Sequence, residues 1–222
     1  MEKKLIQNFK NPDPVYRSAP FWSWNDKLDI RDIKFQIDKM EEGGFCAGFM
    51  HSRIGLITEY FSKDWFRCIR EAVKYAKKKG IRVYLYDEDR WPSGFAGGIV
   101  TKKKKNRIKF LRVIKKGKRY EYEVVNGEST EWFNNFPYVN TLSSESIRDF
   151  VNSTYAQYKK VCGEFFGSVV PAIFTDEPNF LSSKPPDDEK VRHFPWTDGF
   201  EKIFRERYGC LLYTSPSPRD LS

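Results

Sequence analysis

The chain has 222 residues, of which 40% are hydrophobic and 17% aromatic; this is enough for one domain with a buried core, and it excludes an intrinsically disordered protein. Its formal net charge of +9 is concentrated in residues 102–119, which contain eleven Lys or Arg and neither Asp nor Glu. We interpret this window as a solvated surface insert in preference to a polyanion contact, and we do not expect nucleic acid as a partner.

The cysteines and the N-terminal sequence give an expectation for the cellular compartment of the protein. None of the cysteines belongs to a C-x-x-C pair, so we expect free buried thiols in a reducing compartment. The N-terminal residues contain no apolar segment of the kind found in signal peptides, and no apolar stretch is long enough to span a bilayer. We therefore expect a cytoplasmic protein without a membrane partner.

The first half of the chain alternates short apolar runs with amphipathic helical patterns. The runs predict strands at residues 21–24, 45–50 and 81–86. Each helical pattern between them begins at a residue that can cap a helix, Asp29 or Ser62, and stops at glycine, Gly43 or Gly80. This alternation is typical of βα units and a parallel sheet, and therefore of an α/β fold.

A basic segment interrupts the alternation. Residues from about 102 to 140 predict a small β insertion, with strand candidates at 108–114 and 120–125. Asn126-Gly127 is a strong hairpin signal, so we expect a turn there and a further strand over 130–133. Helical patterns resume from Ser143 or Ser144 to Val161 and again from about Asp198 to Gly209.

The stretch 169–180, V-V-P-A-I-F-T-D-E-P-N-F, predicts a fourth buried strand that ends in two carboxylates and a proline. Pro178 favours an extended backbone at Glu177. Asp176 should then point to the other side of the strand, so we do not expect these two acids to form a catalytic pair. Glu177 is the favoured catalytic residue; the alternative is that it only pairs with an arginine at the sheet edge.

Polar residues follow each of the four predicted strands. In a parallel sheet these strand ends meet at one edge, and a set of carboxylates, arginines and tryptophans there suits a polyhydroxylated ligand. The candidate substrate-binding residues are Trp24, Asn25, His51, Arg53, Asp87, Glu88, Arg90, Trp91 and Asp176. A purely structural salt-bridged edge around Arg90 is an equal alternative for the acidic run.

His51 has two interpretations. It could bind a sugar hydroxyl, or it could ligate a metal together with a carboxylate of the run 87–89. The chain has only one other histidine, His193, so a site with several histidine ligands is excluded. Three consecutive acids do not have the spacing of a calcium loop.

Four motifs carry a resemblance to a known family: P-F-W-S-W-N-D, G-F-M-H-S-R, Y-D-E-D-R-W-P-S-G-F-A-G-G and I-F-T-D-E-P. In order and spacing they resemble the start of the catalytic domain of α-L-rhamnosidase-like glycoside hydrolases, glycoside hydrolase family 106 and its relatives. The resemblance covers nearly all of residues 14–209. It implies a (β/α)8 TIM barrel, of which this chain supplies about the first four βα units, and hydrolysis at a terminal deoxysugar such as rhamnose.

The resemblance also implies roles for individual residues. Glu177 matches the general acid on strand four, and His51, Asp87, Glu88 and Arg90 match the substrate side of the barrel. The general base has no counterpart in this chain, so we expect the fragment to be inactive without later strands. The residues themselves indicate no certain cofactor; the resemblance implies calcium assistance and inversion in the full-length enzyme.

The C-terminal residues do not continue any pattern. From Cys210 to Asp220 the sequence C-L-L-Y-T-S-P-S-P-R-D reads like a translated transposase sequencing adapter, a contaminant of metagenomic contigs; a natural Ser/Pro-rich tail is the alternative. We therefore expect residues 1–209 to be the N-terminal half of a barrel glycosidase domain and 210–222 to be non-native. Alone, such a half barrel should be insoluble or should associate.

Two other functions remain open at this point. One is a carbohydrate-binding barrel without catalysis, which would have no second acidic residue at a later strand end. The other is a metal-dependent sugar isomerase on the same fold, against which the shortage of histidine argues.

Overall fold

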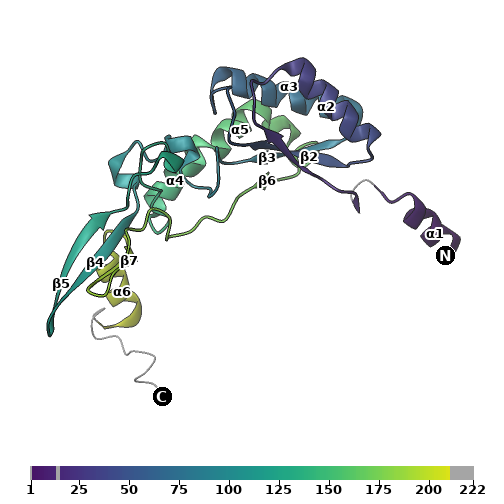
Figure 1. Cartoon of the computed structure of the whole chain (residues 1–222). Helices are drawn as coiled ribbons and strands as arrows, with labels where there is room; N and C mark the ends of the chain where they lie inside the picture. Colours follow the sequence, from purple (N-terminus) through teal and green to yellow (C-terminus); the bar gives the residue numbers. More distant parts are fainter. Residues whose placement is uncertain (1, 14–15, 211–222) are drawn as a thin grey trace. The chain divides into compact units, whose positions relative to one another are not determined.

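The computed structural model describes residues 2–13 and 16–210, so the predicted adapter-derived tail lies outside the described residues except for Cys210. The chain divides into two compact units. Figure 1 labels most of their helices and strands. Unit 1 comprises Met1–Val100 and Arg148–Pro178, and unit 2 comprises Thr101–Ile147 and Asn179–Ser222. The chain thus passes between the two units more than once.

Unit 1 contains a parallel sheet of four strands in the order β1-β2-β3-β6. The strands are β1 (Phe21–Trp24), β2 (Ala47–Ser52), β3 (Arg82–Tyr86) and β6 (Ile173–Phe174). The helices are α1 (Glu2–Lys10), α2 (Ile30–Glu42), α3 (Lys63–Lys79), α4 (Ser144–Ser153), whose first turn belongs to unit 2, and α5 (Tyr155–Cys162). The α/β class and the parallel sheet predicted from the alternating pattern are confirmed.

The helix ends form as their local sequences predict. Asp29 Oδ1 accepts a hydrogen bond from the backbone N–H of Arg31 over 2.7 Å at the start of α2. Ser62 Oγ accepts one from the N–H of Trp65 over 3.1 Å at the start of α3. Gly80 ends α3 with a φ of 73°, a left-handed conformation that costs glycine nothing sterically.

The single helix predicted from Ser143 or Ser144 to Val161 is wrong, because the structure has two helices there. The helix α4 ends at Ser153, and α5 begins at Tyr155. Thr154 between them has φ −115° and ψ −78°, and its Oγ1 donates to the carbonyl of Phe150 over 2.8 Å. A threonine hydroxyl that bonds back to the preceding turn in this way competes with the helical pattern.

The two faces of the parallel sheet differ because side chains alternate along each strand. One face packs on the helices and forms the core, which includes Trp22, Trp24, Met50, Val83 and Leu85 with Ile37, Ile69 and Val73 of α2 and α3. The opposite face carries Phe21, Phe49, His51, Tyr84, Tyr86 and Phe174, whose rings contact one another. The sheet therefore has one face covered by helices and an opposite face lined by aromatic rings that contact one another.

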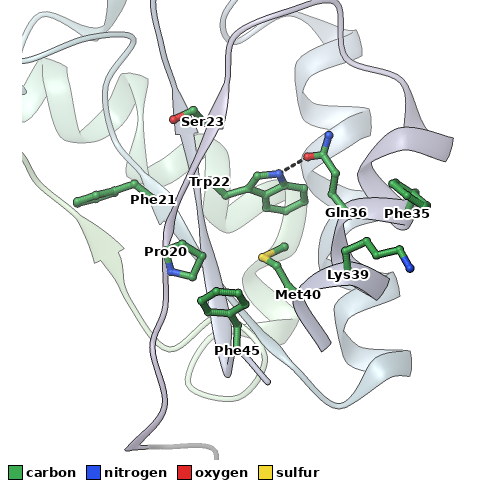
Figure 2. Close-up of a pocket in the computed structure, with 9 residues that line it drawn as sticks. All are labelled: Pro20, Phe21, Trp22, Ser23, Phe35, Gln36, Lys39, Met40 and Phe45. Carbon is green, nitrogen blue, oxygen red and sulfur yellow. Dashed lines mark hydrogen bonds between the residues drawn. The ribbon is translucent and has the colours of Figure 1, made fainter. Parts of the chain in front are cut away.

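The outer edge of β1 is bordered by an open, largely apolar pocket (Figure 2). Trp22 Nε1 donates to Gln36 Oε1 across it, and Phe21 and Phe35 line it while remaining more than half exposed. Within the described residues β1 pairs only with β2, and β6 pairs only with β3. Both edges of this sheet are therefore without a strand partner in that part of the chain.

Unit 2 contains an antiparallel sheet in the order β5-β4-β7. Its elements are β4 (Lys109–Lys116), β5 (Arg119–Asn126), β7 (Val191–Trp196) and α6 (Phe200–Tyr208). The two strands predicted in the basic segment exist, but β7 has no counterpart in the sequence analysis. Short 3-10 turns complete the chain at Ala96–Gly98, Lys104–Asn106, Glu131–Phe133 and Gly163–Phe165.

The predicted hairpin turn at Asn126-Gly127 is wrong. The register pairs Lys116 with Arg119, so the turn consists of Gly117 and Lys118, and Gly117 has the positive φ of 62° that favours glycine. Gly127 instead lies where the backbone passes close to its neighbours, since a Cβ there would come within 2.6 Å of Ile108 Cγ2. The predicted strand at 130–133 is wrong as well: Thr130 forms one isolated bridge, and 131–133 is a 3-10 turn.

All four cysteines are free thiols, with Cys68 and Cys162 buried and Cys46 and Cys210 half-buried. Burial raises the pKa of the Cys162 thiol to about 11. In the part of the chain that the structure describes, no helix combines the length and the apolar character needed to cross a membrane.

Candidate functional site

The candidate site lies at the carboxyl ends of the parallel strands of unit 1. The register places Trp24 beside Ser52 and Tyr86 beside Phe174, so the residues that follow these strands emerge along one edge of the sheet. This edge is where ligands bind in sheets of this class. The structure brings most of the predicted site residues to this edge, but with very different exposure.

Asp87 is fully buried and bound by hydroxyl groups. Ser93 Oγ donates to its Oδ1 over 2.6 Å, and Tyr155 OH and Thr175 Oγ1 donate to its Oδ2 over 2.7 and 2.5 Å. Burial raises the pKa of the Asp87 carboxyl, and the three hydroxyl donors oppose that shift. Asp87 therefore ties β3 to β6 and α5, while Thr175, one of its partners, faces solvent.

Glu88 is also fully buried, and it organises the loop that follows β3. Its Oε1 accepts from the backbone N–H groups of Asp89 and Gly97, and its Oε2 accepts from those of Gly94, Phe95 and Ala96, all at 2.6–2.9 Å. Burial raises the pKa of Glu88 to about 8, against the effect of these N–H donors, which favour the ionised form. The carboxylate thus shapes the loop and has no exposed surface for a ligand.

Asp89 and Arg90 form a small polar cluster with β2. Ser52 Oγ donates to Asp89 Oδ1 over 3.1 Å, and Arg90 binds Asp89 Oδ2 through two nitrogens at 3.1 and 3.0 Å. Asp89 is buried and Arg90 half-buried. The interpretation of this run as a salt-bridged edge therefore holds for the pair Asp89 and Arg90.

Glu177 is exposed at the end of the β6 segment, and Trp91 holds its carboxylate. The indole Nε1 of Trp91 donates to Glu177 Oε2 over 3.1 Å, and Trp91 itself is 44% exposed. The extended backbone predicted at Glu177 is wrong, because its φ is +43°. A non-glycine residue in this region is strained and is held there by its surroundings.

Two hydrogen bonds join Asp176, the neighbour of Glu177, to Ser93. The N–H of Ser93 donates to the carbonyl of Asp176 over 2.8 Å, and the N–H of Asp176 donates to Ser93 Oγ over 2.9 Å. The Asp176 carboxylate turns elsewhere and accepts from Tyr86 OH over 3.3 Å. Asp176 and Glu177 therefore have separate partners.

His51 lies on the aromatic face, close to the edge. Its Nδ1 is 2.8 Å from the carbonyl of Ser52, so this nitrogen carries the proton and Nε2 is the acceptor in the neutral ring. The ring stacks on Tyr86 at 3.8 Å between centroids and is 3% exposed. Burial lowers the pKa of His51 below its usual 6.5, which favours the neutral form.

Of the remaining predicted residues, Trp24 lies apart from this group, whereas Asn25 and Arg53 directly follow β1 and β2. Trp24 is 2% exposed and packs edge-on against Trp22 and Trp65 in the helix-covered core, where a ligand cannot reach it. Asn25 and Arg53 follow their strands as exposed residues, and the N–H of Arg53 donates to the carbonyl of Trp24.

Sequence reasoning missed four residues of the site: Ser93, Tyr155, Thr175 and Tyr86, all of which bind Asp87 or Asp176. Tyr155 could not be found from strand ends because it comes from the first turn of α5. Ser93 lies within the W-P-S-G run, six residues after Asp87, and this proximity in sequence was the only feature that could have identified it as a partner of Asp87.

Metal binding was one interpretation of His51 and the acidic run. Among residues 2–13 and 16–210, no group of three or more His, Cys, Asp or Glu is arranged to hold a metal ion. The carboxylates of Asp87, Glu88 and Asp89 each bind separate protein donors. The described residues therefore do not fit the calcium ion that the sequence resemblance implies.

Comparison with solved structures gives only distant likenesses. No family model and no curated protein matches the chain. A solved structure of a rhamnosidase from Novosphingobium sp. PP1Y is similar to it, with a TM-score of 0.39 and 18% sequence identity, over 56% of this chain and 13% of that chain. The chain thus spans a small part of that protein.

Proposed function

We propose that this chain forms the acid side of a glycosidase site that acts on a terminal sugar of the α-L-rhamnoside type. The observation that carries the proposal is Glu177, an exposed carboxylate held by the indole of Trp91 at the carboxyl edge of a parallel sheet. A fixed carboxylic acid beside an exposed aromatic ring can protonate a glycosidic oxygen while the ring stacks on the sugar.

The other residues of the site have supporting roles in this proposal. Asp87 and Glu88 are buried and bound by protein donors, so they position the β3 loop and β6. His51 is 3% exposed, so its role in this proposal is to pack on Tyr86, whose hydroxyl binds Asp176.

Glycoside hydrolysis needs a second carboxylate at about 5–5.5 Å for retention or about 6.5–9.5 Å for inversion. The three acids of the β3 loop are buried against their own donors, and Asp176 is bound by Tyr86. We therefore propose that the second carboxylate belongs to later strands. Both open edges of the parallel sheet support this, because in a closed (β/α)8 barrel every strand has two neighbours.

In this proposal residues 1–209 are the N-terminal half of a barrel domain, with unit 2 as an insertion, and residues 210–222 are not part of it. Isolated, the half site would bind sugar without cleaving it. A carbohydrate-binding barrel is the second candidate function, favoured because Asp87, Glu88 and Asp89 of the site are buried and the Asp176 carboxylate is bound by Tyr86.

The test has a binding arm and a turnover arm. In the 222-residue chain, methyl α-L-rhamnoside should bind, and Trp91→Ala should abolish binding measured by calorimetry. In the chain extended by the rest of its reading frame, Glu177→Gln should remove most turnover of an aryl α-L-rhamnoside, whereas Glu59→Gln, at an exposed glutamate of the same unit, should not. Wild-type turnover by Glu177→Gln would reject the acid role, and sugar binding without turnover in the extended wild-type chain would favour the binding barrel.

A further inference from the structure

The three-stranded sheet of unit 2 has one face that is both aromatic and basic. In an antiparallel sheet, residues directly opposite each other share a face. The register pairs Lys115 with Tyr120, Val113 with both Tyr122 and Arg192, and Leu111 with Phe194. We call the surface formed by Tyr120, Tyr122, Phe194, Val113, Lys115 and Arg192 the tyrosine face.

The aromatic residues of the tyrosine face are open to solvent. Tyr120 is 53% exposed, Tyr122 is 62% exposed and Phe194 is 52% exposed. Tyr120 and Tyr122 are two residues apart on β5, so their Cα atoms are about 7 Å apart along the strand and their side chains leave the same face. Several exposed aromatic rings on one sheet face are a common feature of surfaces that stack flat or ring-shaped ligands.

The acids of this sheet lie on the opposite face. Glu121 and Glu123 alternate with the tyrosines along β5, and they pair there with Lys116 at 2.8 Å and Arg112 at 2.6 Å. The strands place no carboxylate on the tyrosine face itself. Lys115 and Arg192 are exposed on it, with Asp187 3.7 Å from Arg192 at its border. Asp187 partly balances the charge of Arg192, so the positive charge of the tyrosine face is carried mainly by Lys115.

We propose that the tyrosine face binds an acidic polysaccharide, a chain of sugars with carboxylates at intervals. The tyrosine rings would pack on the sugar rings, and Lys115 and Arg192 would pair with the uronate carboxylates. The tyrosine face would be a second binding site, made of other residues than the candidate site of unit 1. The choice of a glycan as its ligand rests on the proposed function.

The charge pattern argues against the two main alternative occupants. A nucleic acid carries a phosphate on every nucleotide and is bound by closely spaced cations, whereas Lys116 and Arg112 are neutralised by glutamates on the far face. A second copy packed face to face about a two-fold axis would present Lys115 and Arg192 with the same cations, which repel.

The experiment measures binding of polygalacturonate to the 222-residue chain by calorimetry, with neutral galactan and oligo-dT as comparison ligands. Polygalacturonate should bind, and galactan and oligo-dT should bind more weakly. The double substitution Tyr120→Ala and Tyr122→Ala should weaken binding about tenfold. Lys115→Gln should weaken it about threefold.

Lys116→Gln is the matched control, because it removes the same charge from the adjacent exposed residue on the opposite face. It should leave the affinity unchanged, and equal losses from Lys115→Gln and Lys116→Gln would overturn the proposal. Tighter binding of oligo-dT than of polygalacturonate would overturn it in favour of a nucleic-acid surface. Trp91→Ala should bind polygalacturonate normally, so a failure of the catalytic proposal is distinguishable from a failure of this one.

Discussion

Trp91 and Glu177 are 86 positions apart in the sequence, yet the indole nitrogen of one donates to the carboxylate of the other over 3.1 Å. The loop after β3 and the segment after β6 are thereby joined at the exposed edge of the sheet. The hydrogen bond fixes the direction of the one exposed carboxylate of the candidate site, and it can be removed without removing the ring.

Trp91→Phe keeps an aromatic surface but deletes the N–H donor. If a fixed Glu177 contributes to sugar binding, the affinity for methyl α-L-rhamnoside should fall about fivefold, the usual value of one hydrogen bond. Calorimetry on the 222-residue chain measures this. The same substitution at Trp132, a half-exposed tryptophan of unit 2, should leave the affinity unchanged. An unchanged affinity in Trp91→Phe would show that only the ring matters.

Glu88→Ala should destabilise unit 1 strongly. It leaves the five backbone N–H groups of the β3 loop buried without their acceptor, and we expect a loss of at least about 3 kcal/mol in the free energy of unfolding. Glu88→Gln keeps one acceptor oxygen and should cost less, about 2 kcal/mol. Urea unfolding measures both. Equal stability of Glu88→Ala and wild type would contradict the assigned structural role.

The buried His51 should make stability depend on pH. Its pKa is lowered by burial in the folded protein, whereas the unfolded chain takes up the proton near the usual value of 6.5. The contribution of His51 to the unfolding free energy should therefore be fully present above about pH 6.5 and should decrease as the pH falls below it, whereas the raised pKa of Glu88 acts with the opposite sign. In urea unfolding between about pH 7.5 and 5.5, the unfolding free energy of wild type should decrease relative to that of His51→Gln as the pH falls. An NMR titration of the His51 ring that gives a pKa at or above 6.5 would exclude this explanation.

Gly127→Ala should destabilise unit 2 by about 2 kcal/mol through overpacking, because the new Cβ would lie 2.6 Å from Ile108 Cγ2 and 2.9 Å from the carbonyl oxygen of Ser183. Gly48→Ala is a matched comparison. Its Cβ would meet the flexible end of Met40 at 2.8 Å, which can move, so the cost should be smaller. Thermal unfolding of the two variants measures the difference, and the reverse order would refute the reason given.

Sequence periodicity was sufficient for β1, β2 and β3, because they alternate with α2 and α3, each of which has a side-chain cap at its start and a glycine at its end. It was insufficient for β7, whose Pro195 argues against a strand; the proline is tolerated because β7 is an edge strand, where its missing N–H need not be paired. The Asn126-Gly127 pair misled for a related reason, since a glycine can be required by close backbone packing instead of by a turn.

The candidate site, like the fold, could be predicted from the sequence only in part. The position of the acids at strand ends could be read from the sequence, but their exposure could not. Glu88 turns inward because its partners are backbone N–H groups, which every residue except proline has and which therefore leave no sequence signal. The positive φ of Glu177 depends equally on tertiary contacts, and the local rule for a residue before proline predicted the opposite.

The order in which the sheet of unit 1 is assembled has a consequence for synthesis of the protein. The strand β3 ends at Tyr86, and its neighbour β6 begins only at Ile173, after the β4 and β5 hairpin has been made. During synthesis on the ribosome, β3 therefore lacks its neighbouring strand β6, and Asp87 lacks its hydrogen bond from Thr175, until Thr175 has been translated. A nascent chain released early would expose that edge to other strands, so slow folding and dependence on chaperones are the expected cost of placing unit 2 between two neighbouring strands.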